Sequence, residues 1–366
     1  MLAGGTGATN VCGRAWAATQ RYLGSASLAG PTGPSAIGVH SAVLALSRGS
    51  RYPVPIAVSL YLPLQDPPRS GASSDCVAWL ARNPPPHRWA KLPVILFAPG
   101  NGGGRDDAAS SLANLASHGF LVIAIDDVSR DKGLFARFGA TIPALGLGLS
   151  TAEDYAATLR EGAAKVRQQA DKALAALDRV MACAAQVPAW AERVDDRRSG
   201  FLGFSLGGAT AAEAGIMDGR IQAVLNLDGW IFGQALSGGL DKPYALVLSD
   251  DAAPSDDQRR STAVADRNYV ELTDRLIRDA FRLSGRYGGC VTRIVKAKHE
   301  GFTDEIFERR FARSWLSLDP DRMKAIHDDM EVAFFERLRA AADPFWCKAL
   351  LARWPELQAI DPVALR

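Results

Sequence analysis

The stretch GFLGFSLGGATAA, residues 200–212, decides the fold of this chain. A short apolar run at 200–204 predicts a strand, and the small residues from Leu206 to about Ile216 predict a helix. Between them, residues 203–207 match the pattern G-x-S-x-G, which is typical of a sharp strand-to-helix turn that exposes a serine at the edge of a parallel sheet. Glycines allow the close backbone approach that such a turn needs. We therefore expect Ser205 at the carboxyl end of a strand, facing the positive end of a helix.

Regular patterns extend outward from this turn in both directions. Strand-like apolar runs are separated by segments with the apolar spacing of a helix, and this alternation predicts βαβ units in an α/β fold with a mostly parallel central sheet and helices on both faces. The expected strands lie at 54–62, 93–98, 120–126, 200–204, 221–227, 244–249 and 291–297, and the expected helices at 106–118, 153–185, 261–283, 304–316, 320–340 and 344–353.

The domain organisation follows from shifts in composition along the chain. Residues 1–50, rich in Gly, Ala, Ser and Thr, are expected to form an irregular lead-in, and the prolines within 63–90 predict a surface loop. Residues 51–340 are expected to form one domain, with a helical tail at 341–366 packed on it. Residues 132–165 begin Gly-rich and apolar, with Leu134, Phe135, Phe138, Ile142 and Leu145, and are expected to form a lid or pocket wall.

Composition and charge exclude several classes of protein. The chain has 366 residues, of which 48% are hydrophobic and 22% charged, so it can bury an ordinary core. A net charge of +2 with scattered Lys and Arg does not make the basic surface of a nucleic-acid binder. The sequence has no apolar run of about 18 residues, which is the length that would predict a transmembrane helix. We therefore expect a soluble protein. The start lacks the pattern of a signal peptide, and the compartment, cytoplasmic or exported, stays open.

The five cysteines are widely spaced and include no C-x-x-C pair, which argues against a zinc or redox site. Their pairing and the oligomeric state stay open. There is also no H-E-x-x-H pattern, so we expect neither a metal nor a cofactor.

A serine hydroxyl becomes an effective nucleophile only beside a base. Of the five histidines, His299 follows the last expected strand, where the base is delivered when the chain order is Ser, acid, His. His118 and His327 fall in expected helices, and His40 and His87 in the irregular N-terminal part. His299 is therefore the candidate base.

The acid has more than one candidate on position alone. Asp228 closes the strand after the serine turn, while Asp250 and Asp251 close the next one. Either strand end could bring a carboxylate to the imidazole, so the order of the chain leaves the choice open.

Three segments resemble the platelet-activating-factor acetylhydrolase-like and dienelactone-hydrolase-like serine esterases of the α/β-hydrolase superfamily. They are PGNGGGRDDAASSLANLASHGFLVIAID at 99–126, GFSLGGATAA at 203–212 and NLDGW at 226–230. The resemblance implies the α/β-hydrolase fold and places the acid at Asp228, which gives a triad of Ser205, Asp228 and His299. Phe204 departs from the histidine that the family usually has before its serine.

The expected activity is serine-dependent hydrolysis of carboxylic esters through an acyl-enzyme intermediate. The resemblance and the apolar residues near the site suggest short or medium acyl esters of apolar or lipid-like small molecules. The backbone N–H groups of Leu206 and Asn101 are the expected oxyanion donors, and Trp230 and Phe302 the expected pocket residues. Two alternatives stay open: an amidase or peptidase with the same triad, and a non-catalytic binding protein with this fold.

Overall fold

The computed structural model describes residues 30–69, 75–137, 145–284, 287–308, 318–340 and 343–360. These residues form one central sheet of nine strands in the order β1-β2-β4-β3-β5-β6-β7-β8-β9. The middle strands from β4 to β8 pair in parallel, whereas β1, β2 and β9 pair antiparallel. The strands are β1 (Ala36–Leu44), β2 (Ile56–Leu64), β3 (Leu92–Ala98), β4 (Leu121–Ile125), β5 (Val194–Phe204), β6 (Ile221–Leu227), β7 (Tyr244–Leu248), β8 (Cys290–Ile294) and β9 (Leu357–Ala359).

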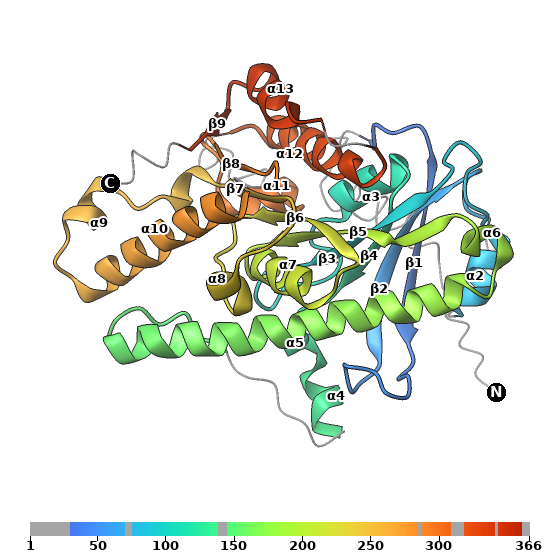
Figure 1. Ribbon diagram of the computed structural model, residues 1–366, viewed down its shortest axis with the longest axis horizontal. Helices are drawn as coiled ribbons and strands as arrows, with labels where there is room; N and C mark the ends of the chain where they lie inside the picture. The colour runs from blue at the N-terminus through green and yellow to red at the C-terminus, as the bar shows by residue number, and fades with distance from the viewer. Residues whose placement is uncertain are drawn as a thin grey trace, which may run out of the picture.

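Helices cover both faces of this sheet (Figure 1). On one face, α2, α5, α7 and α10 supply the apolar side chains that pack against the sheet, and on the other α3, α12 and α13 do so. The α-helices are α2 (Cys76–Arg82), α3 (Ala109–Ser117), α4 (Lys132–Arg137), α5 (Ala152–Ala184), α6 (Pro188–Ala191), α7 (Leu206–Met217), α8 (Gln234–Gly238), α9 (Asp256–Arg260), α10 (Val264–Ser284), α11 (Glu305–Glu308), α12 (Pro320–Phe335) and α13 (Trp346–Arg353), and the 3-10 helices are η1 (Val128–Asp131), η2 (Asp250–Ala252), η3 (His299–Phe302) and η5 (Glu336–Leu338).

Strand β3 shows why the parallel strands read as continuous apolar runs. All of its residues are buried, because helices cover both faces of the sheet. Side chains alternate between faces along a strand. Accordingly Val94 and Leu96 pack into one core and Ile95 and Phe97 into the other.

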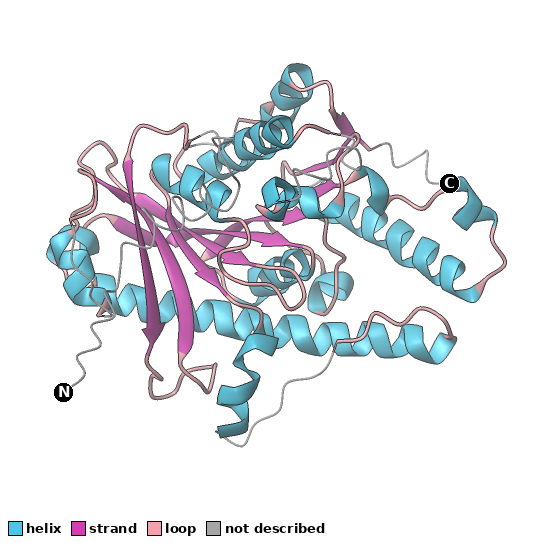
Figure 2. Cartoon of the chain, turned by 180° about the vertical axis from the view of Figure 1, so that it is seen from behind, coloured by secondary structure: helices cyan, strands magenta, loops and turns pink. Residues whose placement is uncertain are grey.

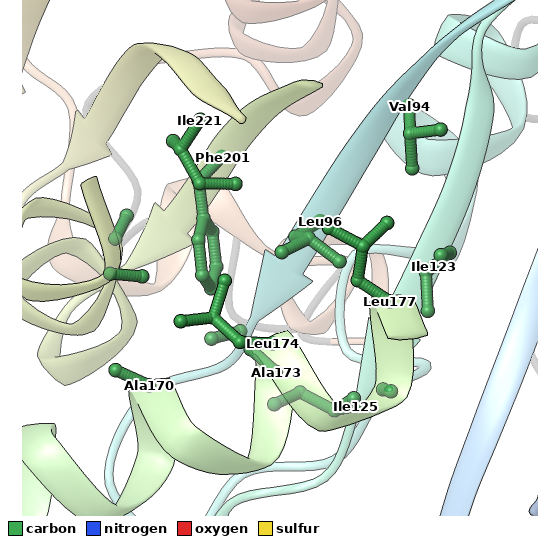
Figure 3. Packing of buried hydrophobic residues seen from close by; sticks show 14 of the residues in the cluster. Val94, Leu96, Ile123, Ile125, Ala170, Ala173, Leu174, Leu177, Phe201 and Ile221 are labelled. Atoms are coloured by element: carbon green, nitrogen blue, oxygen red, sulfur yellow. The ribbon is translucent and has the colours of Figure 1, made fainter. Parts of the chain in front are cut away.

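Helix α5 runs along one face of the sheet across most of the molecule (Figure 2). Its N-cap is Thr151, whose side chain accepts a hydrogen bond from the backbone N–H of Asp154. The sheet-facing side of the helix carries small and aliphatic residues, including Ala170, Leu174 and Leu177, which lie against strand residues such as Leu96 (Figure 3). This packing fixes the rotation of α5 and turns other side chains of the helix toward the carboxyl edge of the sheet.

The structure corrects three boundaries expected from the sequence. Residues 36–44 lie in the stretch expected to be irregular but form β1, which pairs along its whole length with β2. The segment expected to be a surface loop contains α2, held by the buried side chains of Trp79 and Leu80. The tail is not only helical, because β9 adds a strand beside β8. In each case pairing or burial against a distant segment overrides a weak local pattern.

A disulfide joins Cys290 in β8 to Cys347 in α13 and ties the tail to the sheet. Cys76 and Cys183 are free thiols, and Cys12 lies outside the described residues. Within those residues, no helix has both the length and the apolar character needed to cross a membrane.

Candidate active site

Ser205 lies at the turn between β5 and α7 with φ of +53°, a left-handed conformation that costs a non-glycine residue free energy. A Cβ at Gly203 would meet the carbonyl oxygen of Gly207 at 2.0 Å, and one at Gly207 would meet the oxygen of Ala98 at 2.0 Å. The two glycines of the motif are therefore required by the close approach of strand and helix. The tight turn lifts the Ser205 hydroxyl above the carboxyl edge of the sheet.

Asp228 follows β6, the strand beside β5, and also has a positive φ, of +57°. Its backbone N–H donates to the carbonyl of Val247 at 2.8 Å, which holds it against the end of β7. Ser249, just beyond β7, donates its backbone N–H to Oδ1 at 2.8 Å and its hydroxyl to Oδ2 at 2.6 Å. These two donors fix the carboxylate and compensate for its burial.

His299 begins the short 3-10 helix η3 that follows β8. Asp250 organises the loop before it: it accepts a hydrogen bond from the backbone N–H of Lys296 at 2.8 Å and donates its own N–H to Ala297 at 3.0 Å. Asp251 lies 3.4 Å from the Nζ of Lys298. Both alternative acids therefore contact the loop that carries the histidine, and neither contacts the imidazole among the described hydrogen bonds.

The structure brings Ser205, His299 and Asp228 into one hydrogen-bonded line. Nδ1 of His299 lies 2.6 Å from Oδ2 of Asp228, and Nε2 lies 3.2 Å from Oγ of Ser205. An ionised carboxylate can only accept a hydrogen bond, so Nδ1 carries the proton in the neutral imidazole. Nε2 is then left as the acceptor for the serine hydroxyl, as a general base requires.

The pKa of His299 reflects opposing influences. Burial by itself lowers it, but the hydrogen bond to Asp228 and the negative charges of Asp228, Glu300 and Asp251 outweigh burial and raise the pKa above its ordinary value. The ring of Phe204 lies 4.7 Å from the imidazole, centroid to centroid. Phe204 thus packs against the imidazole of His299 from the residue directly before Ser205.

The expected oxyanion donors lie on either side of Ser205. Leu206 is the first residue of α7, where backbone N–H groups have no partner within the helix. Asn101 follows β3 in the loop that passes close to the nucleophile, since a Cβ at Gly100 would lie 3.2 Å from Cβ of Ser205. Both segments therefore border the space above the serine hydroxyl.

A cavity of about 290 Å³ opens at the Ser205 hydroxyl. Trp230 lines it, as does Leu145 from the segment expected to form a lid or pocket wall. Apolar side chains predominate in the wall, which also includes Ser205, Asp228, His299 and a few other polar residues. The lining residues are Asn101, Leu145, Leu147, Ser205, Leu206, Asp228, Trp230, Phe232, Leu248, Ser249, Asp251, Ala252, Tyr269, Leu276 and His299.

Other residues expected at the pocket lie elsewhere. Phe302 is 1% exposed and does not line the cavity; its ring packs in the core, 6.5 Å from that of Phe204 and 6.4 Å from that of His327. Phe135 is likewise buried against the main core, and Leu134 packs beside it. Phe138 and Ile142 lie outside the described residues. Local sequence places an aromatic near the site, but only packing decides which way its ring turns.

Three contributions were not apparent from the sequence. Ser249 donates two hydrogen bonds to the carboxylate of Asp228, and Tyr269 and Leu276 from α10 line the cavity. The position of Ser249 near Asp228 could have been predicted, because Ser249 ends an expected strand and the carboxyl ends of adjacent parallel strands meet at one edge of the sheet. Tyr269 and Leu276 could not have been predicted at the cavity, since nothing in the local sequence shows that α10 reaches it.

A second cluster of polar side chains could be considered for a metal. Ligand atoms of His327, Asp328 and Glu331 all lie within 4.8 Å of one another, and the three residues are buried. However, Lys324 already forms an ion pair with Asp328, and Ser111 donates to the same carboxylate at 2.8 Å. The ammonium of Lys324 supplies positive charge next to the carboxylates of the cluster. We therefore interpret the cluster as a structural network.

Comparison of the chain with family models and with curated proteins finds no match. Among solved structures, the chain is similar to a ferulic acid esterase from Streptomyces cinnamoneus, with a TM-score of 0.55 and 21% identity over 91% of this chain and 99% of that one. Together with the sheet order, this similarity decides the architecture. The chain has the α/β-hydrolase fold.

In the α/β-hydrolase fold the nucleophile stands on a strand-to-helix turn, and the acid and the histidine follow it in the chain. Ser205, Asp228 and His299 have this order and occupy the loops after β5, β6 and β8. The hydrolase fold thus accounts for why residues 94 positions apart, Ser205 and His299, meet above the sheet.

Proposed function

We propose that this chain is a serine-dependent carboxylic-ester hydrolase. The observation that carries the proposal is the hydrogen-bonded line from Ser205 through His299 to Asp228, which ends in a mainly apolar cavity. A serine held at a strained turn beside an imidazole whose other nitrogen faces a carboxylate is the arrangement that activates a hydroxyl for acyl transfer.

The first half of the reaction forms an acyl-enzyme. Nε2 of His299 takes the proton from Ser205 as Oγ bonds to the ester carbonyl carbon. The backbone N–H groups of Leu206 and Asn101 receive the negative charge on the carbonyl oxygen, and one such donor stabilises the transition state by about 3 kcal/mol. As the carbon–oxygen bond to the alcohol breaks, His299 returns the proton to the leaving alcohol.

The second half releases the acyl group. Water gives a proton to Nε2 of His299 and its oxygen attacks the acyl carbon, and Ser205 then leaves with that proton. Throughout, Asp228 stabilises the imidazolium and keeps Nδ1 protonated. Because Ser249 fixes both carboxylate oxygens, the acid needs no rearrangement during the cycle.

The size of the cavity limits the acyl group. At about 290 Å³ it lies just below the range of roughly 300–1,000 Å³ for small-molecule sites. We therefore assign short or medium acyl esters of apolar, lipid-like molecules as the substrate class. The resemblance to the acetylhydrolase-like esterases supports Asp228 as the acid.

A second candidate substrate is an ester of an aromatic acid. Trp230, Phe232 and Tyr269 contribute to the wall, with the ring of Trp230 6.5 Å from that of Phe232 and 6.3 Å from that of Tyr269. Aromatic pairs prefer edge-to-face or offset-stacked arrangements, which an aromatic acyl group can also form with these rings. The similar solved structure is named a ferulic acid esterase, and ferulic acid is aromatic.

The test is hydrolysis of p-nitrophenyl esters from acetate to laurate, of methyl ferulate and of a p-nitroanilide, by wild type and by Ser205→Ala. Serine-dependent turnover of the esters with an optimum at short or medium chains supports the first candidate, and a higher kcat/KM for methyl ferulate supports the second. Serine-dependent cleavage of the anilide alone would replace the proposal with the amidase alternative. No turnover of any substrate would favour a binding protein.

A further inference from the structure

Lys165 is a buried lysine on α5 whose ammonium lies behind the active-site loop. Its side chain is 2% exposed, and its Nζ donates to the side-chain oxygen of Asn101 and lies 3.1 Å from Oδ1 of Asp127. Burying an ammonium is costly unless it is paired and hydrogen-bonded. Both of its partners belong to segments that lie at the carboxyl edge of the sheet, after β3 and after β4.

The loop that Lys165 contacts needs such an anchor. Residues 99–104 read Pro-Gly-Asn-Gly-Gly-Gly, and Gly102 has φ of +76°. Glycine-rich segments lose more conformational freedom on ordering than others do. The neighbouring glycines are held through their backbones: Gly103 accepts from the N–H of Asp127 at 3.1 Å, and Gly102 from Nε of Arg130 at 3.1 Å. Asn101 is held through its side chain.

The charge of Lys165 is balanced locally. Asp127 neutralises it at 3.1 Å, so the pair has little net charge to act on a reacting oxygen at a distance. What the ammonium does provide is a charge-assisted hydrogen bond of fixed direction to one side chain. Its influence on chemistry therefore passes through the position of Asn101.

We propose that Lys165 is a positioning residue for the oxyanion hole, which sets the direction of the Asn101 backbone N–H by holding the Asn101 side chain. This inference rests on the proposed esterase function and adds a role for the side chain of Asn101, which a backbone donor alone does not require. Transition-state stabilisation by a donor depends on its exact aim, and misplacement by about 1 Å can cost about 100-fold in rate.

Helix α5 provides a matched control. Lys172 lies seven residues further along the helix, about two turns, and is 0% exposed. Its Nζ forms an ion pair with Asp131 at 2.5 Å and donates to the carbonyl of Asp126 at 2.9 Å. Within the described residues its bonds go to this segment after β4, and none goes to residues 99–104. Lys172→Met therefore removes an equivalent buried cation from the same helix.

The experiment compares kcat and KM of Lys165→Met, Lys172→Met, Asn101→Ala and Asn101→Ala/Lys165→Met on one p-nitrophenyl ester. It also measures inhibition by phenylboronic acid, which forms a tetrahedral adduct with an active serine.

We expect Lys165→Met and Asn101→Ala each to lower kcat by about 10- to 100-fold with little change in KM. The double variant should lose no more than the worse single one, because both changes break one contact. Boronate inhibition should weaken by the same factor as kcat, and Lys172→Met should keep kcat within about twofold at a temperature where it is folded.

Additive losses in the double variant, or an equal loss of kcat in Lys172→Met, would overturn the inference. If Lys165→Met does not fold, Asn101→Ala remains decisive, because Asn101 is an exposed residue and its variant keeps the backbone N–H. Unchanged kcat in that variant overturns the inference as well. Failure of the proposed function is distinguishable, because wild type would then lack ester turnover that depends on Ser205.

Discussion

Two regions of this molecule bring together a serine, a histidine and an aspartate. One is Ser205, His299 and Asp228 at the carboxyl edge of the sheet, and the other is Ser111, His327 and Asp328 between α3 and α12. In the first, serine and aspartate face opposite nitrogens of the imidazole. In the second, Oγ of Ser111 lies 3.2 Å from Nδ1 of His327 and donates a hydrogen bond to Asp328 at 2.8 Å. The hydroxyl proton of Ser111 therefore points to the carboxylate and not to the imidazole.

The surroundings of the two groups differ as much as their internal order. Ser205 stands on a strained turn at a cavity, whereas Ser111 is 2% exposed within the helix α3 and His327 is 4% exposed. Lys324 pairs with Asp328, which leaves that carboxylate committed to an ammonium. The comparison teaches that residue types alone do not distinguish the two groups. Placement on opposite nitrogens of the imidazole, access to the cavity and a strained turn distinguish Ser205 from Ser111.

The largest expected effect separates the two serines. Ser205→Ala should lower kcat for ester hydrolysis by about 10⁶-fold, because it removes the attacking atom. Ser111→Ala should leave kcat unchanged in a folded sample, because its hydroxyl lies outside the cavity. Steady-state kinetics of both purified variants checks this. Loss of turnover in Ser111→Ala at wild-type stability would contradict the distinction between the two groups.

The next effect concerns the acid. Asp228→Asn should lower kcat by about 10⁴-fold, since an amide favours the wrong tautomer of His299 and cannot stabilise its charged form. Asp250→Asn is the control, because Asp250 contacts the backbone of Lys296 and not the imidazole. The same ester assay measures both. A greater loss in Asp250→Asn would move the acid from β6 to β7.

A smaller effect concerns the pH dependence of the base. Only neutral His299 can accept the serine proton, so kcat/KM should fall about tenfold per pH unit below its pKa. The surrounding carboxylates raise that pKa, so the midpoint of the acid limb should lie above the ordinary histidine value of about 6.5. Asp251→Asn removes one of these charges and should move the midpoint to lower pH. A shift in the opposite direction would show that Asp251 does not stabilise the imidazolium.

The last prediction concerns the buried group of Ser111, His327 and Asp328. We expect a change in the stability of the protein and not in its activity. Ser111→Ala leaves His327 and Asp328 with one partner fewer in a buried place, which should cost about 1–3 kcal/mol in the free energy of unfolding. Denaturant unfolding followed by tryptophan fluorescence measures it. Ser47→Ala, at a surface position, is a suitable control. An equal and negligible change in both variants would mean that the cluster does not support the fold.

Much of the architecture could be predicted from local patterns. The residues of β3 and β4 are apolar because both faces of these strands are buried, and the alternation with helices indicated a parallel sheet. β1 could not be found in this way. It lies at the edge of the sheet, only five of its nine residues are buried, and its pairing partner β2 begins twelve residues beyond its end. A weak local preference there becomes a strand only through pairing.

The same distinction between local sequence and tertiary packing applies to the candidate site. The sequence by itself determined the strained turn at Ser205, because G-x-S-x-G carries its own steric reason, and the order in which Ser205, Asp228 and His299 follow one another. Position along the chain left Asp228, Asp250 and Asp251 open, and the family resemblance favoured Asp228, whose hydrogen bond to the imidazole appears in the tertiary structure. Only the tertiary structure decided that Phe302 turns into the core and that Lys165 reaches Asn101. The reason is physical: a turn is built from adjacent residues, whereas the partner of a side chain depends on how strands align and helices rotate against them.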